Sequence, residues 1–304
     1  MPVLGRTELD VFGICLGGNV FGWTADEAES FEVLDAYVEA GGNFIDTANS
    51  YLVEHGRSET IIGRWMAERG NRDELVIATK VGGGKGPKRS LSRQTIEQEA
   101  RASLERLQTD RIDLYYAHFD DQDTPLEETL RAFDALVQAG TVRAIGASNY
   151  SPERLTEALE IQQLKGFAPF TALQPHYNLL ERDFERTMLP VADAWDLAVV
   201  PYYGLAKGFL TGKYRSETVD SRRAEGAGAY LDERGEAVLE ALDEVASAHD
   251  EPVAAVALAW LLAHPRVQAP IASARTVEQL REMLPAATLE LSEQEMDRLS
   301  ATTR

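Results

Sequence analysis

The stretch Gly42-Asn43-Phe44-Ile45-Asp46-Thr47-Ala48-Asn49-Ser50-Tyr51 contains a short apolar run that becomes polar within a few residues. Phe44 and Ile45 follow the turn pair Gly41-Gly42, and a short apolar run bounded by turn residues is typical of a covered parallel strand. Asp46 would then stand at the carboxyl end of that strand, with Tyr51 on the following loop. Both residues could simply mark a strand end, so their interpretation depends on whether the pattern recurs.

The pattern does recur along the chain. Apolar runs that end in a polar or aromatic residue predict eight strands, near residues 14, 44, 76, 114, 144, 172, 200 and 269. Helical patterns lie between these runs, for example where Phe31, Leu34 and Val38 share one helix face. Strands that alternate with helices indicate a parallel sheet with right-handed crossovers.

Eight such units favour a closed barrel over an open doubly wound sheet. The sequence has no G-x-G-x-x-G motif after its first predicted strand, which weighs further against a Rossmann fold. We therefore predict an α/β fold of the (β/α)8 TIM barrel type, in which residues 1–304 form a single domain. An N-terminal β-hairpin within residues 3–18 and extra C-terminal helices would complete it.

Local signals predict where some elements begin. Thr24 with Glu27, and Ser292 with Glu295, have the spacing of a capping box at a helix start. Residues 214–230 are polar, glycine-containing and aperiodic, so we predict a long loop there. Loops of that length in a compact domain are usually functional or mobile.

Composition limits the classes of protein that this chain can belong to. Its 304 residues are 44% hydrophobic but contain no apolar run long enough to span a bilayer. The single cysteine, Cys15, excludes an internal disulfide, and Met1–Arg6 lacks the features of a secretion signal. We therefore expect a soluble cytoplasmic protein and favour a monomer. The net charge of −20 argues against nucleic acid or an anionic membrane as partner, so an anionic ligand would need a local basic cluster.

Polar residues stand at nearly every predicted strand end, where a (β/α)8 barrel carries its reactive groups. Any one of them has an ordinary structural explanation, because a histidine or lysine there could be a satisfied or solvated side chain. Their convergence predicts an active site at this end of the barrel. The residues concerned are Asp46, Tyr51, Lys80, His118, Ser148, Asn149, Gln174, Tyr202, Ser273 and Arg275.

Four of these residue types together suit proton donation to a carbonyl group that receives hydride. A tyrosine is a poor acid near neutral pH unless its phenolate is stabilised, which the ammonium of Lys80 would do by lowering the pKa of Tyr51. Asp46 would keep a buried Lys80 charged, and His118 could donate a hydrogen bond to the carbonyl oxygen. The sequence contains no competing metal-ligand cluster and no Ser-His-Asp arrangement.

Over essentially its full length the chain resembles the aldo-keto reductase superfamily. Especially specific are the runs Asp113–His118, Ile145–Tyr150 and Gln174–Arg182. The resemblance is carried by Gly42–Tyr51 with Gly56–Glu59, Ala78–Lys80, Asp113–His118 with Thr124–Leu130, Gly140–Tyr150, and Pro201–Tyr214.

The resemblance implies an oxidoreductase that reduces an aldehyde or ketone with NADP(H), NAD(H) being less expected. Asp46, Tyr51, Lys80 and His118 would form its catalytic tetrad, with Tyr51 as the proton donor. Ser148, Asn149 and Gln174 would hold the nicotinamide carboxamide, and Tyr202 would stack on the ring. The segment Leu205–Lys213, with Lys207, Gly208 and Lys213, would follow the pyrophosphate, and Ser273, Arg275 and Gln279 would meet the adenosine 2′-phosphate.

Three positions depart from the pattern of the family. Tyr203-Gly204 replaces a frequent Ser-Pro, Met283 replaces an asparagine that often contacts the adenine, and Ser273 replaces a lysine common in one branch. The strength of the preference for NADPH therefore stays open, and Arg275 could instead be a solvated arginine at a helix start. Phe21 and Trp23 are candidate substrate-pocket walls, with ordinary packing as the alternative.

Two other functions remain as alternatives. Some relatives are nucleotide-binding regulatory subunits of potassium channels with slow turnover, although this sequence shows no N-terminal arm for plugging a pore. Lys80 could also act as a Schiff-base nucleophile in a barrel enzyme. The sequence does not reveal which carbonyl compound is used or in which direction the reaction runs.

Overall fold

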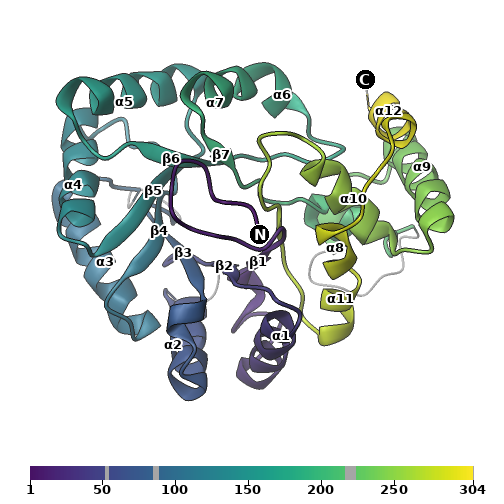
Figure 1. The fold of residues 1–304 in the computed structure, drawn as a ribbon, viewed down its shortest axis with the longest axis horizontal. Helices are drawn as coiled ribbons and strands as arrows, with labels where there is room; N and C mark the ends of the chain where they lie inside the picture. The colour runs from purple at the N-terminus through teal and green to yellow at the C-terminus, as the bar shows by residue number, and fades with distance from the viewer. Residues whose placement is uncertain (52–54, 85–88, 216–223, 304) are drawn as a thin grey trace.

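The computed structural model describes residues 1–51, 55–84, 89–215 and 224–303, and in this part of the chain eight parallel strands curl into a barrel surrounded by helices (Figure 1). The strands are β1 (Cys15–Gly17), β2 (Phe44–Asp46), β3 (Val76–Val81), β4 (Ile112–Ala117), β5 (Val142–Ser148), β6 (Phe170–Gln174), β7 (Ala198–Val199) and β8 (Ile271–Ala272). Their order in the sheet is β7-β6-β5-β4-β3-β2-β1-β8. A parallel bridge between Val199 and Val267, and an N–H of Ile271 that donates to the Pro201 carbonyl at 2.8 Å, join its two edges. The predicted (β/α)8 fold is confirmed.

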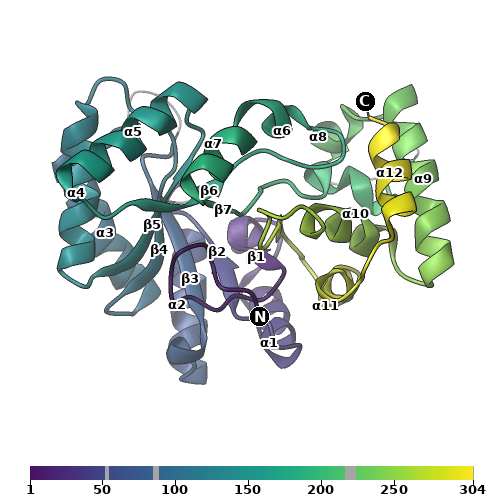
Figure 2. The same cartoon turned by 45° about the horizontal axis from the view of Figure 1, so that its top comes forward.

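The helices surround the sheet and extend beyond it on one side. Helices α9 (Glu233–His249) and α12 (Glu293–Ala301) run side by side outside the barrel, at the end of the molecule opposite α3 (Arg93–Leu107) and α4 (Leu126–Gln138) (Figure 2). No helix in the described part of the chain is both long and apolar enough to cross a membrane. The helices are α1 (Glu27–Glu39), α2 (Arg57–Arg69), α3 (Arg93–Leu107), α4 (Leu126–Gln138), α5 (Pro152–Lys165), α6 (Asp183–Thr187), α7 (Leu189–Trp195), α8 (Ala224–Gly228), α9 (Glu233–His249), α10 (Val253–Leu262), α11 (Val277–Arg281) and α12 (Glu293–Ala301).

Alternation along the strands separates two apolar cores. In β2 and β3, Phe44, Val76 and Ala78 point into the barrel, whereas Ile45 and Ile77 pack against the helices. The N-terminal segment closes the amino-terminal end of the barrel by adding Leu4, Leu9 and Val11 to the inner core. In Figure 1 this segment crosses the centre of the barrel.

The predicted N-terminal β-hairpin is reduced to a turn. Val3 and Asp10 form a single antiparallel bridge, and the N–H of Leu4 donates to the Leu9 carbonyl at 2.8 Å. The segment does not continue this pairing, because its apolar side chains are used to fill the barrel end. The hairpin prediction is therefore correct in that the chain reverses direction here, but wrong in that the two arms do not pair beyond this bridge.

Of the two predicted capping boxes, one needs correction and the other is confirmed. Helix α1 is capped by Asp26 and Glu29 and not by Thr24 and Glu27, since the N–H of Thr24 already donates to the Val20 carbonyl in a preceding turn. The capping box of Ser292 and Glu295 starts α12 as predicted.

The predicted loop 214–230 contains the short helix α8. Helix α8 packs on the 3-10 segment Ala206–Thr211 and contributes the buried Ala227. One turn of helix is too short to produce a detectable hydrophobic period, so the sequence did not reveal it. Residues 216–223 of the predicted loop lie outside the described part of the chain.

Helices α2 and α3 touch at Gly63, and this contact predicts a stability effect. A Cβ at Gly63 would lie 2.2 Å from the Arg106 carbonyl oxygen and 2.7 Å from the backbone of Leu107, so backbone would have to move. We expect Gly63→Ala to lower the free energy of unfolding by about 1–3 kcal/mol. In the control Gly228→Ala, an added Cβ meets nothing within 4 Å, so denaturant unfolding followed by circular dichroism should show no loss. Equal stability of the two variants would contradict the close helix contact.

Candidate active site

Side chains along each strand point alternately into the barrel and toward the helices, and this alternation brings polar side chains together at the carboxyl end of the barrel. Phe44, Val76 and Leu114 point into the barrel, and residues at even spacing from them keep that direction. Asp46, Lys80 and His118 therefore meet above the apolar core. The same alternation brings Ser148, Gln174, Tyr202 and Ser273 to this end from β5, β6, β7 and β8.

A buried ion pair lies at the centre of this cluster. The Nζ of Lys80 donates hydrogen bonds to Asp46 Oδ2 at 2.5 Å, to the Thr47 carbonyl at 2.8 Å and to Tyr51 Oη at 2.7 Å. The phenolic O–H of Tyr51 in turn donates to Asp46 Oδ2 at 2.8 Å. Lys80 and Asp46 are each only 1% exposed, so water cannot replace these partners. The three side chains form one hydrogen-bonded unit.

Burial and charge set the protonation states of this unit. Burial lowers the pKa of Lys80, although the neighbouring Asp46 carboxylate acts in the opposite direction. Burial, followed by the charge of Asp46 and its hydrogen bond, raises the pKa of Tyr51 well above its ordinary value. The expectation that Lys80 lowers the pKa of Tyr51 is therefore wrong for the structure as it stands, because Asp46 lies equally close to the phenol. Tyr51 is protonated at neutral pH.

His118 stands beside Tyr51 with one nitrogen directed away from the cavity. Its Nδ1 lies 3.4 Å from Ser50 Oγ, and its ring contacts the Tyr51 ring edge-on at 6.4 Å between centroids. A Cβ at Gly83 would lie 2.3 Å from the same Nδ1, so only glycine fits there. Burial, followed by the charges of Lys80 and Arg89, lowers the pKa of His118 to about 3. The imidazole is thus neutral, and its Nε2 remains for a ligand.

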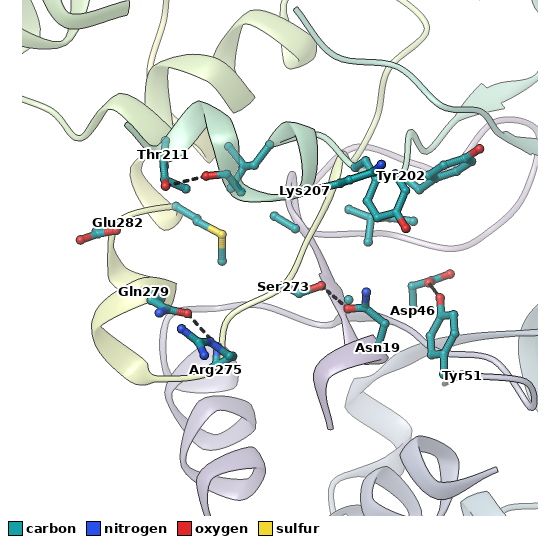
Figure 3. Close-up of a pocket in the computed structure, with 18 of the residues that line it drawn as sticks. Asn19, Asp46, Tyr51, Tyr202, Lys207, Thr211, Ser273, Arg275, Gln279 and Glu282 are labelled. Carbon is teal, nitrogen blue, oxygen red and sulfur yellow. Dashed lines mark hydrogen bonds between the residues drawn. The ribbon is translucent and has the colours of Figure 1, made fainter. Parts of the chain in front are cut away.

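A cavity of about 730 Å³ extends from this cluster to helix α11 (Figure 3). Asp46 and Tyr51 lie at one end of the cavity, and Arg275 and Gln279 lie at the other. Lys80 does not line it but lies beneath Asp46 and Tyr51. The other candidate residues that line the cavity are His118, Ser148, Asn149, Gln174, Tyr202, Leu205, Lys207, Gly208, Lys213 and Ser273.

Amide and hydroxyl groups form a continuous hydrogen-bonded chain along the cavity wall next to the ion pair. Gln174 Nε2 donates to Asp46 Oδ1 at 2.9 Å, and Ser148 Oγ donates to the Gln174 carbonyl at 2.8 Å. Asn149 Nδ2 donates to the His118 carbonyl at 2.8 Å, and Tyr202 Oη donates to Asn149 Oδ1 at 3.0 Å. This wall offers amide donors and acceptors beside the flat ring of Tyr202.

The middle of the cavity suits an anion. Ala206, Lys207 and Gly208 have φ values of 46°, 59° and 99°, and in this tight turn the N–H groups of Ala206 and Gly208 donate to the carbonyls of Tyr203 and Leu205. Lys207, Lys213 and Arg215 add positive charge at the same wall. In a chain with a net charge of −20 this is a local basic cluster of the kind that an anionic ligand requires.

The far end of the cavity combines an arginine with polar and apolar neighbours. The backbone N–H of Arg275 donates to Gln279 Oε1 at 3.1 Å, which holds the start of α11 against the cavity (Figure 3). Ser273 Oγ donates to Asn19 Oδ1 at 2.7 Å. Met283 and Glu282 also line this end. Arg275 can therefore attract an anionic group beside the apolar side chain of Met283, although the carboxylate of Glu282 acts against it.

The structure differs from the sequence analysis at the candidate substrate walls and reveals other lining residues. Phe21 is 3% exposed and belongs to the apolar core between strands and helices, so it forms no wall, and Trp23 does not line the cavity either. Asn19 lies in the 3-10 turn Gly18–Val20 after β1, where the alternation along a strand no longer applies, so no sequence pattern marked it. Phe119 directly follows His118, but the alternation of side chains along a strand does not extend into the loop. The other lining residues that the sequence analysis did not select are Tyr203, Thr211, Gly212, Tyr214, Arg215, Ala254, Ile271, Ala272, Glu282 and Met283.

No group of three or more His, Cys, Asp or Glu side chains is arranged to hold a metal ion in residues 1–51, 55–84, 89–215 and 224–303. The chemical groups that converge are a protonated phenol, an ammonium, a carboxylate and a neutral imidazole. Such a set can donate a proton and polarise an oxygen atom.

Residues 13–304 match the model of the aldo/keto reductase family. The chain is 39% identical to the uncharacterized oxidoreductase YrpG of Bacillus subtilis, in an alignment that covers 96% of this chain and 92% of that protein. It is 35% identical to a norsolorinic acid reductase of Aspergillus flavus, over 93% of this chain and 75% of the relative. It is 33% identical to the putative aryl-alcohol dehydrogenase AAD14 of Saccharomyces cerevisiae, over 99% and 86%.

The ion pair at the centre of the site predicts an asymmetric stability effect. Asp46→Asn leaves a buried ammonium without its carboxylate, which should lower the free energy of unfolding by about 3–5 kcal/mol. Removing both charges in Asp46→Asn/Lys80→Met should cost clearly less, because no unpaired charge remains. Urea unfolding followed by tryptophan fluorescence measures both effects.

A surface pair gives the control for this experiment. Glu97→Gln removes the partner of the exposed Arg93 and should cost at most about 1 kcal/mol. The interpretation fails if Asp46→Asn costs no more than Glu97→Gln, or if the double variant is less stable than Asp46→Asn alone.

Proposed function

The chain belongs to the aldo/keto reductase family and is an oxidoreductase, and we propose that it is an NADP(H)-dependent enzyme that reduces an aldehyde or ketone to the alcohol, with Tyr51 as the proton donor. The observation that carries this proposal is the hydrogen-bonded unit of Lys80, Asp46 and Tyr51 at the end of a long cavity.

The relatives favour an aromatic carbonyl compound as substrate. One is named for the reduction of norsolorinic acid and another as an aryl-alcohol dehydrogenase. Phe119 provides an aromatic wall beside His118, with 4.8 Å between the ring centroids. A flat substrate could pack against that wall while its carbonyl group reaches Tyr51.

The cavity wall fits a nicotinamide dinucleotide. The amide chain of Asn149 and Gln174 suits a carboxamide, and the ring of Tyr202 suits a planar heterocycle. The basic turn at Lys207 suits a pyrophosphate, and Arg275 suits a 2′-phosphate because its guanidinium has a planar fork of donors. The bound cofactor would supply the hydride.

The side chains of this protein would then handle the proton and the carbonyl oxygen. Tyr51 starts protonated because its pKa is raised, so it can give its O–H proton to that oxygen. Lys80, at 2.7 Å, would stabilise the resulting phenolate until the phenol regains a proton from solvent. The neutral imidazole of His118 would donate from Nε2 and orient the carbonyl group.

The surroundings of Lys80 argue against its use as a Schiff-base nucleophile. Its side chain is fully buried, and each of its three N–H groups has an acceptor in Asp46, Thr47 or Tyr51. A nucleophilic lysine needs a free lone pair that faces the substrate. The ammonium of Lys80 is held by a carboxylate instead.

The proton-donor role predicts a separation of turnover from cofactor binding. Tyr51→Phe should lower kcat for a benzaldehyde substrate by about 10²–10⁴-fold, because the transferable proton is lost. NADPH affinity, measured by quenching of tryptophan fluorescence, should stay within about twofold. Tyr115→Phe is the control, since the Tyr115 hydroxyl is buried, lies outside the cavity and has no hydrogen-bond partner among the described residues. Parallel loss of binding and turnover in Tyr51→Phe would make Tyr51 a structural residue.

The role of Arg275 predicts a change in cofactor preference. Arg275→Ala should weaken NADPH binding by about 10–100-fold and leave NADH binding nearly unchanged, because only NADPH carries the 2′-phosphate. Arg281→Ala removes the same charge from an exposed position of α11 and should change neither affinity. Wild-type protein that binds NADPH and NADH equally would contradict the proposed preference.

A further inference from the structure

The loops after two neighbouring strands meet beside His118 and carry an arginine and a phenylalanine. Strands β3 and β4 pair up to Val81 and Ala117, and the N–H of His118 donates to the Val81 carbonyl at 2.8 Å. Arg89 lies beyond β3 and Phe119 lies beyond β4. The two loops therefore approach the same side of the cavity.

Arg89, Phe119 and His118 are in successive contact. The guanidinium carbon of Arg89 lies 4.0 Å from the centroid of the Phe119 ring, a cation–π contact. The same ring stacks on the imidazole of His118 at 4.8 Å between centroids, with 29° between the planes. Positive charge is thus held one aromatic ring away from the imidazole.

A buried aspartate fixes the relative position of the two loops. Asp121 is 7% exposed, and its Oδ2 accepts hydrogen bonds from the N–H of Leu91 at 2.7 Å and from Thr124 Oγ1 at 2.6 Å. The hydroxyl of Thr129, on α4, donates to the Leu91 carbonyl at 2.9 Å. Arg89 therefore stands two residues from an anchored position and does not depend on the cation–π contact alone.

The guanidinium keeps donors available for a ligand. Its only hydrogen bond to another described residue is a long one of 3.5 Å from Nε to the Gly84 carbonyl, and no described carboxylate forms an ion pair with it. The nearby aspartates do not compensate its charge, since Asp120 pairs with Arg154 and the exposed Asp123 makes no ion pair with Arg89. Among the described residues, none accepts a hydrogen bond from its two terminal NH₂ groups, which can serve a carboxylate acceptor.

From this arrangement we infer that Arg89 and Phe119 form a rim site that selects aromatic aldehydes or ketones carrying a carboxylate group. The inference rests on the proposed carbonyl reduction and adds a substrate class to it. The ring of the substrate packs beside Phe119, its carbonyl oxygen reaches Tyr51 and His118, and its carboxylate pairs with Arg89.

The overall charge makes a local cation necessary for such a substrate. A protein with a net charge of −20 repels carboxylates from most of its surface. Arg89 lies at an exposed position, so water and salt weaken its attraction. The selectivity should therefore be modest and should decrease as ionic strength rises.

A matched pair of substrates tests the inference. 4-Carboxybenzaldehyde carries the carboxylate, and 4-formylbenzamide is a neutral analogue of nearly the same shape. We expect wild-type kcat/KM with NADPH to be about three- to tenfold higher for the carboxylate. Arg89→Gln should abolish this preference by lowering kcat/KM for the carboxylate while leaving the amide within about twofold. Arg93→Gln, which removes the same charge from an exposed position on α3, should keep the preference.

Binding of benzoate provides a second measurement that needs no turnover. Calorimetric titration of the protein with NADP⁺ present should show weaker benzoate binding in Arg89→Gln than in wild type or Arg93→Gln. The inference is overturned if Arg89→Gln keeps the substrate preference, if Arg93→Gln loses it equally, or if the benzoate affinities of the two variants agree. If wild type reduces neither aldehyde, the proposed function fails, and the benzoate titration still decides whether Arg89 binds a carboxylate.

Discussion

The hydrogen-bonded pair of Lys80 and Asp46 is the constraint on which the rest of the site depends. An ammonium group inside a barrel is tolerated only when a carboxylate and further acceptors replace its water. Asp46, the Thr47 carbonyl and Tyr51 do so completely, which requires β2 and β3 to keep the register that pairs Asp46 with Ala78. The loop that carries Tyr51 is therefore positioned by the need to satisfy a buried charge.

This arrangement also explains why the phenol is held as a neutral donor. Lys80 alone would favour the phenolate of Tyr51, but Asp46 accepts the hydrogen bond of the phenolic O–H and adds negative charge at nearly the same distance. Because the effects of Lys80 and Asp46 on the phenol oppose each other, burial determines the net shift and raises the pKa of Tyr51. Burial likewise keeps His118 neutral. Under the proposed function, the site holds its donors in the protonation states that reduction needs.

The sequence located the elements in which apolar residues recur at a regular spacing. All eight strands lie where apolar runs predicted them, and the alternation that separates Phe44 from Ile45 also directs Asp46 and Lys80 inward. The predictions were wrong where contacts between distant parts of the chain determine the structure. Phe21 follows the first strand as a pocket residue would, but the fold needs its ring in the core, and α8 is too short to show a period. The contact of Arg89 with Phe119 joins two loops that no sequence pattern relates.

The distribution of charge connects the two ends of the cavity. A strongly acidic protein that binds anions must concentrate its cations, and Lys207, Lys213 and Arg275 do this along the wall that we propose for the cofactor. Arg89 is not among the residues that line this cavity, and it reaches His118 only through the ring of Phe119. A cation next to His118 but outside the proposed cofactor wall is difficult to explain by cofactor binding alone. It is explained if both reactants are anions and each has its own local cation in a field that otherwise repels it.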